Sequence, residues 1–278
     1  MLAVQHITYS YGRRLAPVFQ DFSLTFKQGH IYGLLGKNGT GKSTLLYIMS
    51  GLLRTQKGHV AFEGMNVLER QPEMLREMFL VPEEFSLPPI SLRQYVQLHA
   101  PFYPHFNEEI LYKCLMDFEL NQDMHLGALS MGQKKKVFMS IALATGAKLL
   151  LMDEPTNGLD IPSKSLFRKV ISQYLREDQT LIISTHQVND VAMLLDHVVM
   201  LEGSQLLLNR STAEICATLC FEERSSQQPT DDALYVQPSI HGNSVITLNT
   251  DPDVETSINL ELLFNCAQKG KLPETLTR

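Results

Sequence analysis

The sequence of 278 residues lacks three features that would each mark a familiar class of protein. No stretch reaches the roughly 20 apolar residues of a membrane-spanning helix, since even VAMLLDHVVML is interrupted by Asp196 and His197. Residues 221–278 hold four of the 24 basic and nine of the 30 acidic residues, so the rest of the chain is nearly balanced in charge. A basic surface for nucleic acid is therefore missing, and no nucleic-acid partner is expected.

Disulfide or zinc spacing is also missing among the four cysteines. Cys216 and Cys220 are four residues apart on an expected helix, and we interpret them as buried thiols rather than as metal ligands. The N-terminal segment has polar Gln5 and His6 where a signal peptide has its apolar run. We therefore expect the chain to stay in the cytosol.

Short, wholly apolar segments alternate with segments of helical period, which predicts an α/β fold with a buried, mostly parallel sheet. A helical insertion is expected over about 88–146, because apolar residues recur there at helical spacing. Further helices are expected at about 163–175 and 187–195. Strands are expected at residues 2–9, 22–26, 31–35, 59–62, 149–152, 181–184 and 198–201.

The end of the chain differs in composition from the rest. Residues 222–232 are polar and without periodicity, so we interpret 221–233 as a linker between a main domain, 1–220, and a small C-terminal extension, 234–278. A strand at 244–248 and a helix at 260–268 are the only elements expected in this extension. We predict an accessory role for it in self-association or partner contact.

A glycine-rich segment predicts a phosphate-binding loop. It fits G-x-x-x-x-G-K-[ST] directly after the strand at 31–35 and before a helical stretch. Inward N–H groups and the helix dipole of such a loop hold the phosphates of a nucleotide. Lys42 is expected to contact the β- and γ-phosphates, and Ser43 to bind Mg²⁺. The candidate nucleotide-binding residues of the loop are Gly36, Asn38, Gly39, Thr40, Gly41, Lys42, Ser43 and Thr44.

Two acids follow the apolar strand at 149–152, at the sheet edge where open α/β folds bind ligands. Asp153 is expected to hold Mg²⁺ through water, and Glu154 to polarise the attacking water of a phosphoryl transfer. His186 follows the next apolar strand and is expected at the same edge. A neutral imidazole there can hydrogen-bond the γ-phosphate or that water. The catalytic candidates are thus Lys42, Glu154 and His186.

Three further segments resemble motifs of the ATP-binding cassette (ABC) ATPases. Residues 129–133, LSMGQ, resemble the LSGGQ signature, residues 153–160, DEPTNGLD, resemble the second acidic motif and D-loop, and residues 184–186 resemble the switch histidine. The resemblance covers about residues 1–210. It implies a P-loop NTPase fold of ABC type, with a RecA-like, mostly parallel sheet, an antiparallel β subdomain, a helical subdomain and a short C-terminal extension.

The resemblance also implies ATP and Mg²⁺ as cofactors and adds site residues. Tyr11 stands where the family stacks an aromatic ring on adenine. Ser130 is placed to cap the helix that follows it, and with Gly132 and Gln133 it would face the γ-phosphate held by a partner subunit. Asp160 of the D-loop completes the candidate nucleotide-binding residues.

Two departures from the family pattern stand out, and a lysine run follows the signature. Glu83 replaces the usual glutamine of the Q-loop, and a carboxylate there can bind Mg²⁺, so the candidate metal ligands are Ser43, Glu83 and Asp153. Met131 replaces the first glycine of the signature. This replacement is either tolerated or tunes the affinity for the partner. The lysines at 134–136 are expected on a solvated helix face, with added positive potential near phosphate as the alternative.

The function implied is an ATP-hydrolysing subunit that powers a membrane ABC transporter through ATP-dependent sandwich dimerisation. Its partners would be an integral-membrane permease subunit on a separate chain and a second ABC ATPase subunit, in a homodimer or heterodimer. The chain would then be cytoplasmic and peripheral on the inner face of the cell membrane. LHAPFYPHFN and LSMGQKKK resemble the bacterial exporter-type (ABC-2) branch. The alternative is a soluble single-cassette ABC ATPase, such as an iron-sulfur assembly ATPase. The aromatic residues of 83–106 either line a groove that receives a helix of the permease or belong to the core.

Overall fold

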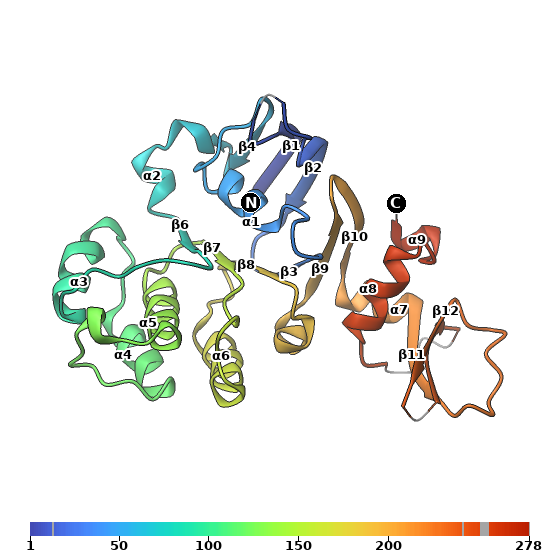
Figure 1. Cartoon of the computed structure of the whole chain (residues 1–278). Helices are drawn as coiled ribbons and strands as arrows, with labels where there is room; N and C mark the ends of the chain where they lie inside the picture. Colours follow the sequence, from blue (N-terminus) through green and yellow to red (C-terminus); the bar gives the residue numbers. More distant parts are fainter. Residues whose placement is uncertain (13, 241, 251–255, 278) are drawn as a thin grey trace.

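The computed structural model describes residues 1–12, 14–240, 242–250 and 256–277. Within them, one six-stranded sheet has the strand order β10-β9-β3-β8-β7-β6, and smaller sheets of four and three strands flank it. In Figure 1 the four-stranded sheet lies above the six-stranded one, helices α3 to α6 lie below it, and the C-terminal elements lie at the right. None of the helices in the described part of the chain is both long and apolar enough to span a membrane.

The six-stranded sheet positions the site. Its parallel strands are β6 (Met78–Val81), β7 (Leu149–Asp153), β8 (Thr180–Thr185), β3 (Ile31–Leu35) and β9 (His197–Glu202), and β10 (Gln205–Ser211) pairs antiparallel with β9. Every residue of β7 and β8 is buried, as expected for apolar strands covered on both faces. Because Asp153 pairs with Ser184 and Leu35 with Thr185, the segments that follow β3, β7 and β8 emerge side by side.

An antiparallel subdomain precedes and follows β3 in the chain. It contains β1 (Leu2–Tyr9), β2 (Phe19–Phe26), β4 (Lys57–Phe62) and β5 (Met65–Asn66), and it shares a buried core with α1 (Lys42–Met49). The strands expected at 22–26 and 59–62 are present but begin earlier than predicted, at Phe19 and Lys57. Short turn-like elements, η1 (Val67–Glu69) and α2 (Pro72–Leu75), connect this subdomain to β6.

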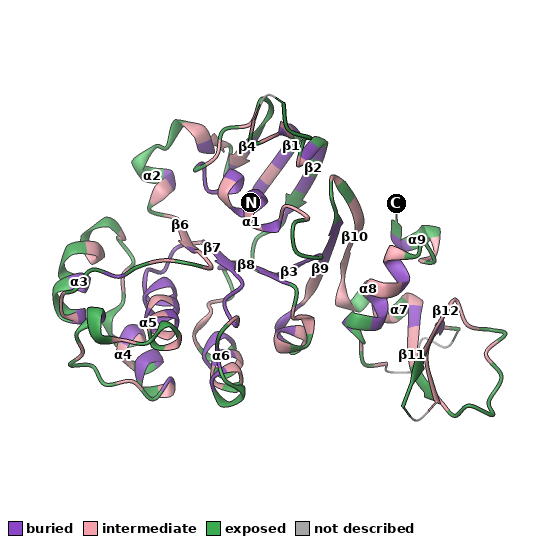
Figure 2. Ribbon diagram, in the orientation of Figure 1, coloured by how far each residue is buried: buried purple, intermediate pink, exposed green. Residues whose placement is uncertain are grey.

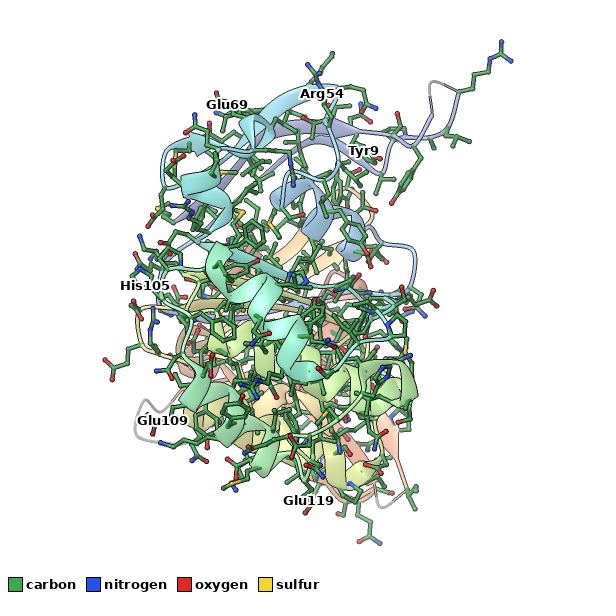
Figure 3. All side chains as sticks on the ribbon, turned by 90° about the vertical axis from the view of Figure 1, so that its left-hand side faces the viewer. Tyr9, Arg54, Glu69, His105, Glu109 and Glu119 are labelled. Atoms are coloured by element: carbon green, nitrogen blue, oxygen red, sulfur yellow. The ribbon has the colours of Figure 1, made fainter. Side chains whose placement is uncertain are left out.

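A helical subdomain lies between β6 and β7 and has a core of its own. It consists of α3 (Leu92–His99), η2 (Ala100–Phe102), α4 (Glu108–Asp117), η3 (Leu126–Ala128) and α5 (Met131–Ala144). Figure 3 views this side of the molecule. Glu109 and Glu119 mark its far end, and Arg54 and Glu69 mark the antiparallel subdomain at the opposite end.

The prediction of a helix at 187–195 is wrong. After α6 (Ile161–Tyr174) and β8, the chain forms two short 3₁₀ turns, η4 (Val188–Asp190) and η5 (Ala192–Leu194). Valine, asparagine and aspartate are poor helix formers, and the Asp190 carboxylate is held 2.7 Å from Lys164 Nζ on α6. Local propensity and this tertiary ion pair together favour turns over a continuous helix.

The C-terminal part is more ordered than the sequence indicates. It comprises α7 (Thr212–Thr218), β11 (Leu219–Arg224), β12 (Tyr235–Ser239), β13 (Gly242–Leu248), α8 (Leu260–Gln268) and α9 (Glu274–Thr277). Strand β11 occupies the start of the linker expected at 221–233, because it pairs along its whole length with β13. It also contains Cys220, which therefore does not share a helix with Cys216.

The extension packs into the main core. Leu262 and Leu263 of α8 belong to the same buried cluster as Val191, Leu208 and Phe167 of the preceding α/β unit. Figure 2 shows the buried residues running through α8 beside β10. The boundary at residue 220 therefore does not coincide with a break in the hydrophobic core.

Candidate functional site

The candidate site is a pocket of about 500 Å³ at the carboxyl ends of β3, β7 and β8. Four loops from the six-stranded sheet, which follow β3, β6, β7 and β8, and one from the antiparallel subdomain form its wall. The lining residues are Tyr11, Val18, Asn38, Gly39, Gly41, Lys42, Ser43, Thr44, Glu83, Glu154, Asn157 and His186. Most residues that the sequence assigns to nucleotide, metal and catalysis are thus brought together here.

The loop before α1 has room only for glycine at two positions. Gly41 has a φ of 94°, and a Cβ on it would lie 2.7 Å from Val18 Cγ1. A Cβ on Gly36 would lie 2.6 Å from Thr40 Oγ1 and 2.9 Å from the Leu201 carbonyl oxygen. The glycines therefore allow the tight backbone path that points N–H groups at an anion.

Lys42 is a buried cation at the first position of α1. Its Nζ donates to the carbonyls of Gly36, at 2.8 Å, and Lys37, at 3.1 Å, and lies 3.9 Å from Glu154 Oε1. Burial lowers the pKa of Lys42, and the charges of Glu154 and Asp153 oppose that shift. An ammonium held by neutral carbonyls can exchange them for phosphate oxygens, which are stronger acceptors.

Asp153 lies at the end of β7 with 2% of its surface exposed. Its Oδ1 accepts hydrogen bonds from Ser43 Oγ, at 3.0 Å, and from Ser184 Oγ. Burial raises the pKa of Asp153, and the charges of Glu83 and Glu154 add to the increase, while the two hydroxyl donors oppose it. The carboxylate form is thus under strain from desolvation and like charge, which a divalent cation would relieve.

The donor set fits Mg²⁺. Ser43, Asp153 and Glu83 offer a hydroxyl and two carboxylates, and hard oxygen atoms are the ligands that Mg²⁺ prefers. Within the described residues, no three histidine, cysteine or acidic side chains converge as a metal cage. Mg²⁺ does not require one, since it is commonly held by one or two carboxylates, substrate phosphates and water.

Glu154 is held in one orientation. Its carboxylate accepts from Thr185 Oγ1, at 3.1 Å, and from the His186 backbone N–H, at 3.1 Å, and lies 2.8 Å from His186 Nδ1. Its backbone N–H donates to the Ser184 carbonyl at 3.0 Å, and its φ is 44°. This left-handed backbone is unfavourable for a residue with a side chain. The surrounding contacts therefore fix a conformation that the residue would not adopt alone.

His186 and Tyr11 both line the pocket. The His186 side chain is 34% exposed and lies against Glu154, as expected for a switch histidine. Tyr11 is 60% exposed, and its hydroxyl lies 2.7 Å from Thr44 Oγ1. An exposed ring that is tethered at its hydroxyl is available to stack on a planar base.

Glu83 has a partner that the sequence did not indicate. Asn157 Nδ2 donates to Glu83 Oε1 at 2.8 Å, which ties the Q-loop to the D-loop within one chain. The position of Asn157 in the DEPTNGLD segment was the available signal. Asn157 contacts Oε1, so the second carboxylate oxygen of Glu83 takes no part in this hydrogen bond.

The signature residues do not line the pocket. Ser130 caps α5 as predicted: its Oγ accepts from the Gln133 N–H, and Gln133 Oε1 accepts from the Ser130 N–H at 3.0 Å. Asp160 caps α6 through the Ser163 N–H, at 2.9 Å, and hydrogen bonding to the Ser163 side chain and backbone lowers the pKa of Asp160. Gly132 lies beside the D-loop, where a Cβ would be 3.6 Å from Leu159 Cδ2. These groups form a second surface of the chain.

The prediction of a solvated lysine run is wrong for Lys135. This side chain is 4% exposed, and its Nζ donates to the carbonyls of Glu154, at 3.0 Å, and Asn157, at 2.8 Å. Lys134 and Lys136 are half-buried. The available signal was helical spacing, since Lys135 lies four residues before buried Met139.

Known proteins match both the sequence and the fold. The family described as "ABC transporter" matches residues 19–157. The chain is 28% identical over 202 residues to ABC transporter ATP-binding protein NatA of Bacillus subtilis, covering 70% of this chain and 82% of NatA. It is 30% identical over 223 residues to lantibiotic transport ATP-binding protein SrtF of Streptococcus pyogenes, covering 76% and 90%. It is 32% identical over 243 residues to cobalt import ATP-binding protein CbiO of Salmonella typhi, covering 82% and 88%.

Solved structures match the same part of the fold. An ATP binding subunit of an ABC transporter superposes with a TM-score of 0.70 at 23% identity, over 77% of this chain and 91% of that chain. The dimeric, post-hydrolysis ATP-binding cassette MJ0796 bound to ADP and Pi gives a TM-score of 0.66 at 21% identity, over 76% and 98%. At these identities the structures establish a shared fold, with its mixed sheet and two subdomains.

Proposed function

Because this chain belongs to the ABC transporter family and is an ATPase of that family, we propose that it powers a membrane transporter of exporter type by hydrolysing Mg·ATP. The observation that carries the proposal is the fixed carboxylate of Glu154 beside Lys42 in a pocket that also offers a magnesium site. Its position suits the activation of water next to a bound terminal phosphate.

Binding would begin at the phosphate loop. The phosphates replace the Gly36 and Lys37 carbonyls as partners of the Lys42 ammonium, and the loop N–H groups supply neutral donors. Adenine stacks on Tyr11. These contacts place the terminal phosphate near the ends of β7 and β8, where the acids lie.

Mg²⁺, when bound, neutralises charge that develops on the phosphate oxygens. The chain would hold it through Ser43 and Asp153, with Glu83 as a third ligand. Because the pKa of Asp153 is raised, its carboxylate is unfavourable without a counter-charge, and a bound cation would stabilise it.

Glu154 would act as the general base. Its oxygens accept from Thr185 and from the His186 backbone, so the carboxylate cannot rotate away from the pocket. A water near the terminal phosphate gives its proton to Glu154 as the oxygen attacks phosphorus. His186, in contact with the same carboxylate, orients the water or the γ-phosphate.

Two chains would close on two nucleotides. Ser130 and Gly132 lie outside the pocket of their own chain, at an exposed helix start whose N–H groups and dipole attract anions. We infer that they cover the terminal phosphate held by a second copy or by a related ATPase subunit. Met131, 46% exposed, would then lie at that interface.

A second groove fits a membrane partner. It has a volume of about 520 Å³ and a mainly apolar wall between the antiparallel and helical subdomains. Phe102 is 65% exposed there, while Leu87 and Tyr95 are buried, so the aromatic segment contributes both groove and core. We infer that a cytoplasmic helix of a separate permease chain occupies the groove and holds this subunit on the inner face of the membrane. The lining residues are Ser50, Leu52, Arg70, Pro72, Leu75, Arg76, Met78, Phe79, Leu80, Phe102, Tyr103 and Leu151.

The Glu154→Gln variant tests the proposal. It keeps the size of the side chain but removes the base, so turnover should fall by about 100-fold to 10,000-fold. Mg·ATP should bind and persist, and size-exclusion chromatography should show a dimer with ATP and a monomer with ADP. Adding Ser130→Arg should remove the dimer by steric clash.

Glu69→Gln is the matched control, because this exposed acid lies on the antiparallel subdomain away from the pocket. It should hydrolyse ATP at the parent rate. Parent-rate hydrolysis by Glu154→Gln, or a monomer at saturating ATP, would contradict the assignment. Copurification with a polytopic membrane protein distinguishes the transporter from a soluble ATPase.

A further inference from the structure

Lys135 connects the signature helix to the segment that carries the proposed base. It lies on α5, and its ammonium donates to the carbonyls of Glu154 and Asn157, at 3.0 and 2.8 Å. These carbonyls lie at the two ends of one turn, which is itself closed by a hydrogen bond from the Asn157 N–H to the Glu154 carbonyl at 3.1 Å. The ammonium therefore bridges the two ends of the turn.

The clamped turn contains an unfavourable backbone. Glu154 has a φ of 44°, and Pro155 follows it. The residue before a proline favours extended backbone with negative φ, and a left-handed conformation is unfavourable for a residue with a Cβ. Without the ammonium, the Asn157 N–H alone would hold the Glu154 carbonyl, and we expect the Glu154 peptide to relax toward its preferred conformation. The carboxylate would move with it.

The second carbonyl extends the clamp to the metal site. Asn157, whose carbonyl accepts from Lys135, donates through its side chain to Glu83. One buried ammonium thus supports both the acid expected to activate water and an acid expected to bind Mg²⁺. The charges of Glu83 and Glu154 favour the ammonium form of Lys135 against the opposing effect of burial, which lowers its pKa.

Lys135 has no direct role in the pocket. It does not line the nucleotide pocket, and both of its acceptors are backbone carbonyls. It borders a separate cavity of about 180 Å³ that also touches Met131, Gly132 and Glu83. Any displacement of the signature helix would therefore reach the Glu154 turn through this side chain.

We propose that Lys135 is a positioning residue for hydrolysis, which holds the turn of Glu154 and Asn157 from the signature helix and thereby fixes the Glu154 carboxylate toward the attacking water. This proposal rests on the proposed role of Glu154. It predicts that the ammonium contributes to turnover and not to nucleotide affinity.

The test compares single and double variants of the full chain. Lys135→Met keeps the length and apolar stem but removes the ammonium, so kcat should fall by about 10-fold to 100-fold, as a displacement near 1 Å can cause. The Kd for Mg·ATP, measured by equilibrium binding, should change by less than about threefold, because Lys135 contacts neither the phosphate loop nor Tyr11, and Ser43 and Asp153 remain to hold Mg²⁺. Lys135→Arg, which restores a cation with two or more donors, should recover part of kcat.

Lys134→Met is the matched control, since it removes the same group from the preceding, half-buried position. It should leave kcat within about twofold of the parent, as substitutions away from specific contacts do. The decisive comparison uses Glu154→Gln as background. Because Lys135 acts through Glu154, adding Lys135→Met there should cause no further loss of single-turnover rate.

Several results would overturn the proposal. A folded Lys135→Met protein with the parent kcat would show that Lys135 does not act through Glu154. The same conclusion would follow if Lys135→Met lowered the single-turnover rate as much in the Glu154→Gln background as it lowers kcat in the parent. If Lys135→Met fails to unfold cooperatively, Lys135→Gln, whose amide is too short to span both carbonyls, replaces it with the same expected split between kcat and Kd. If Glu154→Gln itself keeps the parent rate, the proposed base is wrong, and that outcome is distinct from a failure of Lys135 alone.

Discussion

Leu263→Ala tests whether the C-terminal extension belongs to the ATPase core. Leu263 lies on α8 with 0% of its surface exposed and joins the same buried cluster as Val191 and Leu208. Leu-to-Ala changes at such sites cost about 2–5 kcal/mol, through lost transfer energy and the cavity left behind. Taking about 3 kcal/mol and an unfolding entropy of about 2.1 cal/mol/K per residue over a cooperative chain of this length, the Tm should fall by about 5 °C.

The assay follows thermal unfolding with two probes. Far-UV circular dichroism reports the whole chain, and release of a bound fluorescent ATP analogue reports the ATPase unit. If the extension shares one core with that unit, both probes should shift together by about the same amount. Leu248→Ala is the control, because this leucine of β13 is 49% exposed and should shift the Tm by about 1 °C or less.

The refuting result is a separation of the two probes. An unchanged nucleotide-release transition, with an early loss of part of the circular dichroism signal, would show that the extension unfolds alone. Truncation after Phe221 tests the same question by removing all the residues that follow. The sequence predicts that it leaves ATP binding intact, whereas the packing of α8 on β10 and on the turn at 188–190 predicts a strongly destabilised ATPase unit.

The remaining predictions concern charges in the pocket. Lys42→Ala should weaken Mg·ATP binding by at least about 30-fold, since a hydrogen bond to a charged group contributes about 2 kcal/mol; near-parent affinity in equilibrium binding would contradict the phosphate loop. Asp153→Asn should abolish Mg²⁺-dependent turnover and yet stabilise the nucleotide-free protein near neutral pH, because the raised pKa of Asp153 makes parent stability fall as pH rises from the ordinary value of 3.8 through the folded-state value. The stability difference between the two proteins should shrink as pH falls through that range, and a constant difference in Tm across it would refute the argument.

The sequence predicts those parts of the fold that depend on local patterns. The apolar runs that form β7 and β8 are short, as is typical of buried parallel strands, and Asp153, Glu154 and His186 at their ends lie at the ligand-binding edge. Residues 131–144 form a helix that begins directly after Ser130, as expected, because Ser130 and Gln133 cap it reciprocally. The phosphate loop is predicted from its residue spacing alone, although the groups that leave no room for a Cβ at Gly41 and Gly36 include Val18 and Leu201, which are distant in sequence.

What the sequence could not show depends on contacts between distant segments. Lysine is usually solvated, and the burial of Lys135 depends on carbonyls 19 and 22 residues away. The two turns at 188–194 depend in part on an ion pair with Lys164 of another helix. The packing of α8 depends on an apolar face that β10 and η4 leave open, which no pattern within residues 234–278 reveals.

Two buried lysines face the same group of acids, and their acceptors separate their roles. The Lys42 ammonium is held by carbonyls of the phosphate loop itself, inside the pocket, so a bound phosphate can take their place. The Lys135 ammonium does not line the pocket and is held by the carbonyls of Glu154 and Asn157, at the two ends of the Glu154 turn. Nucleotide binding should therefore change the partners of Lys42 and leave those of Lys135 unchanged. A site that binds a polyanion and also keeps a carboxylate in a fixed position needs both kinds of cation. A cation that exchanges its partners cannot also serve as a fixed support.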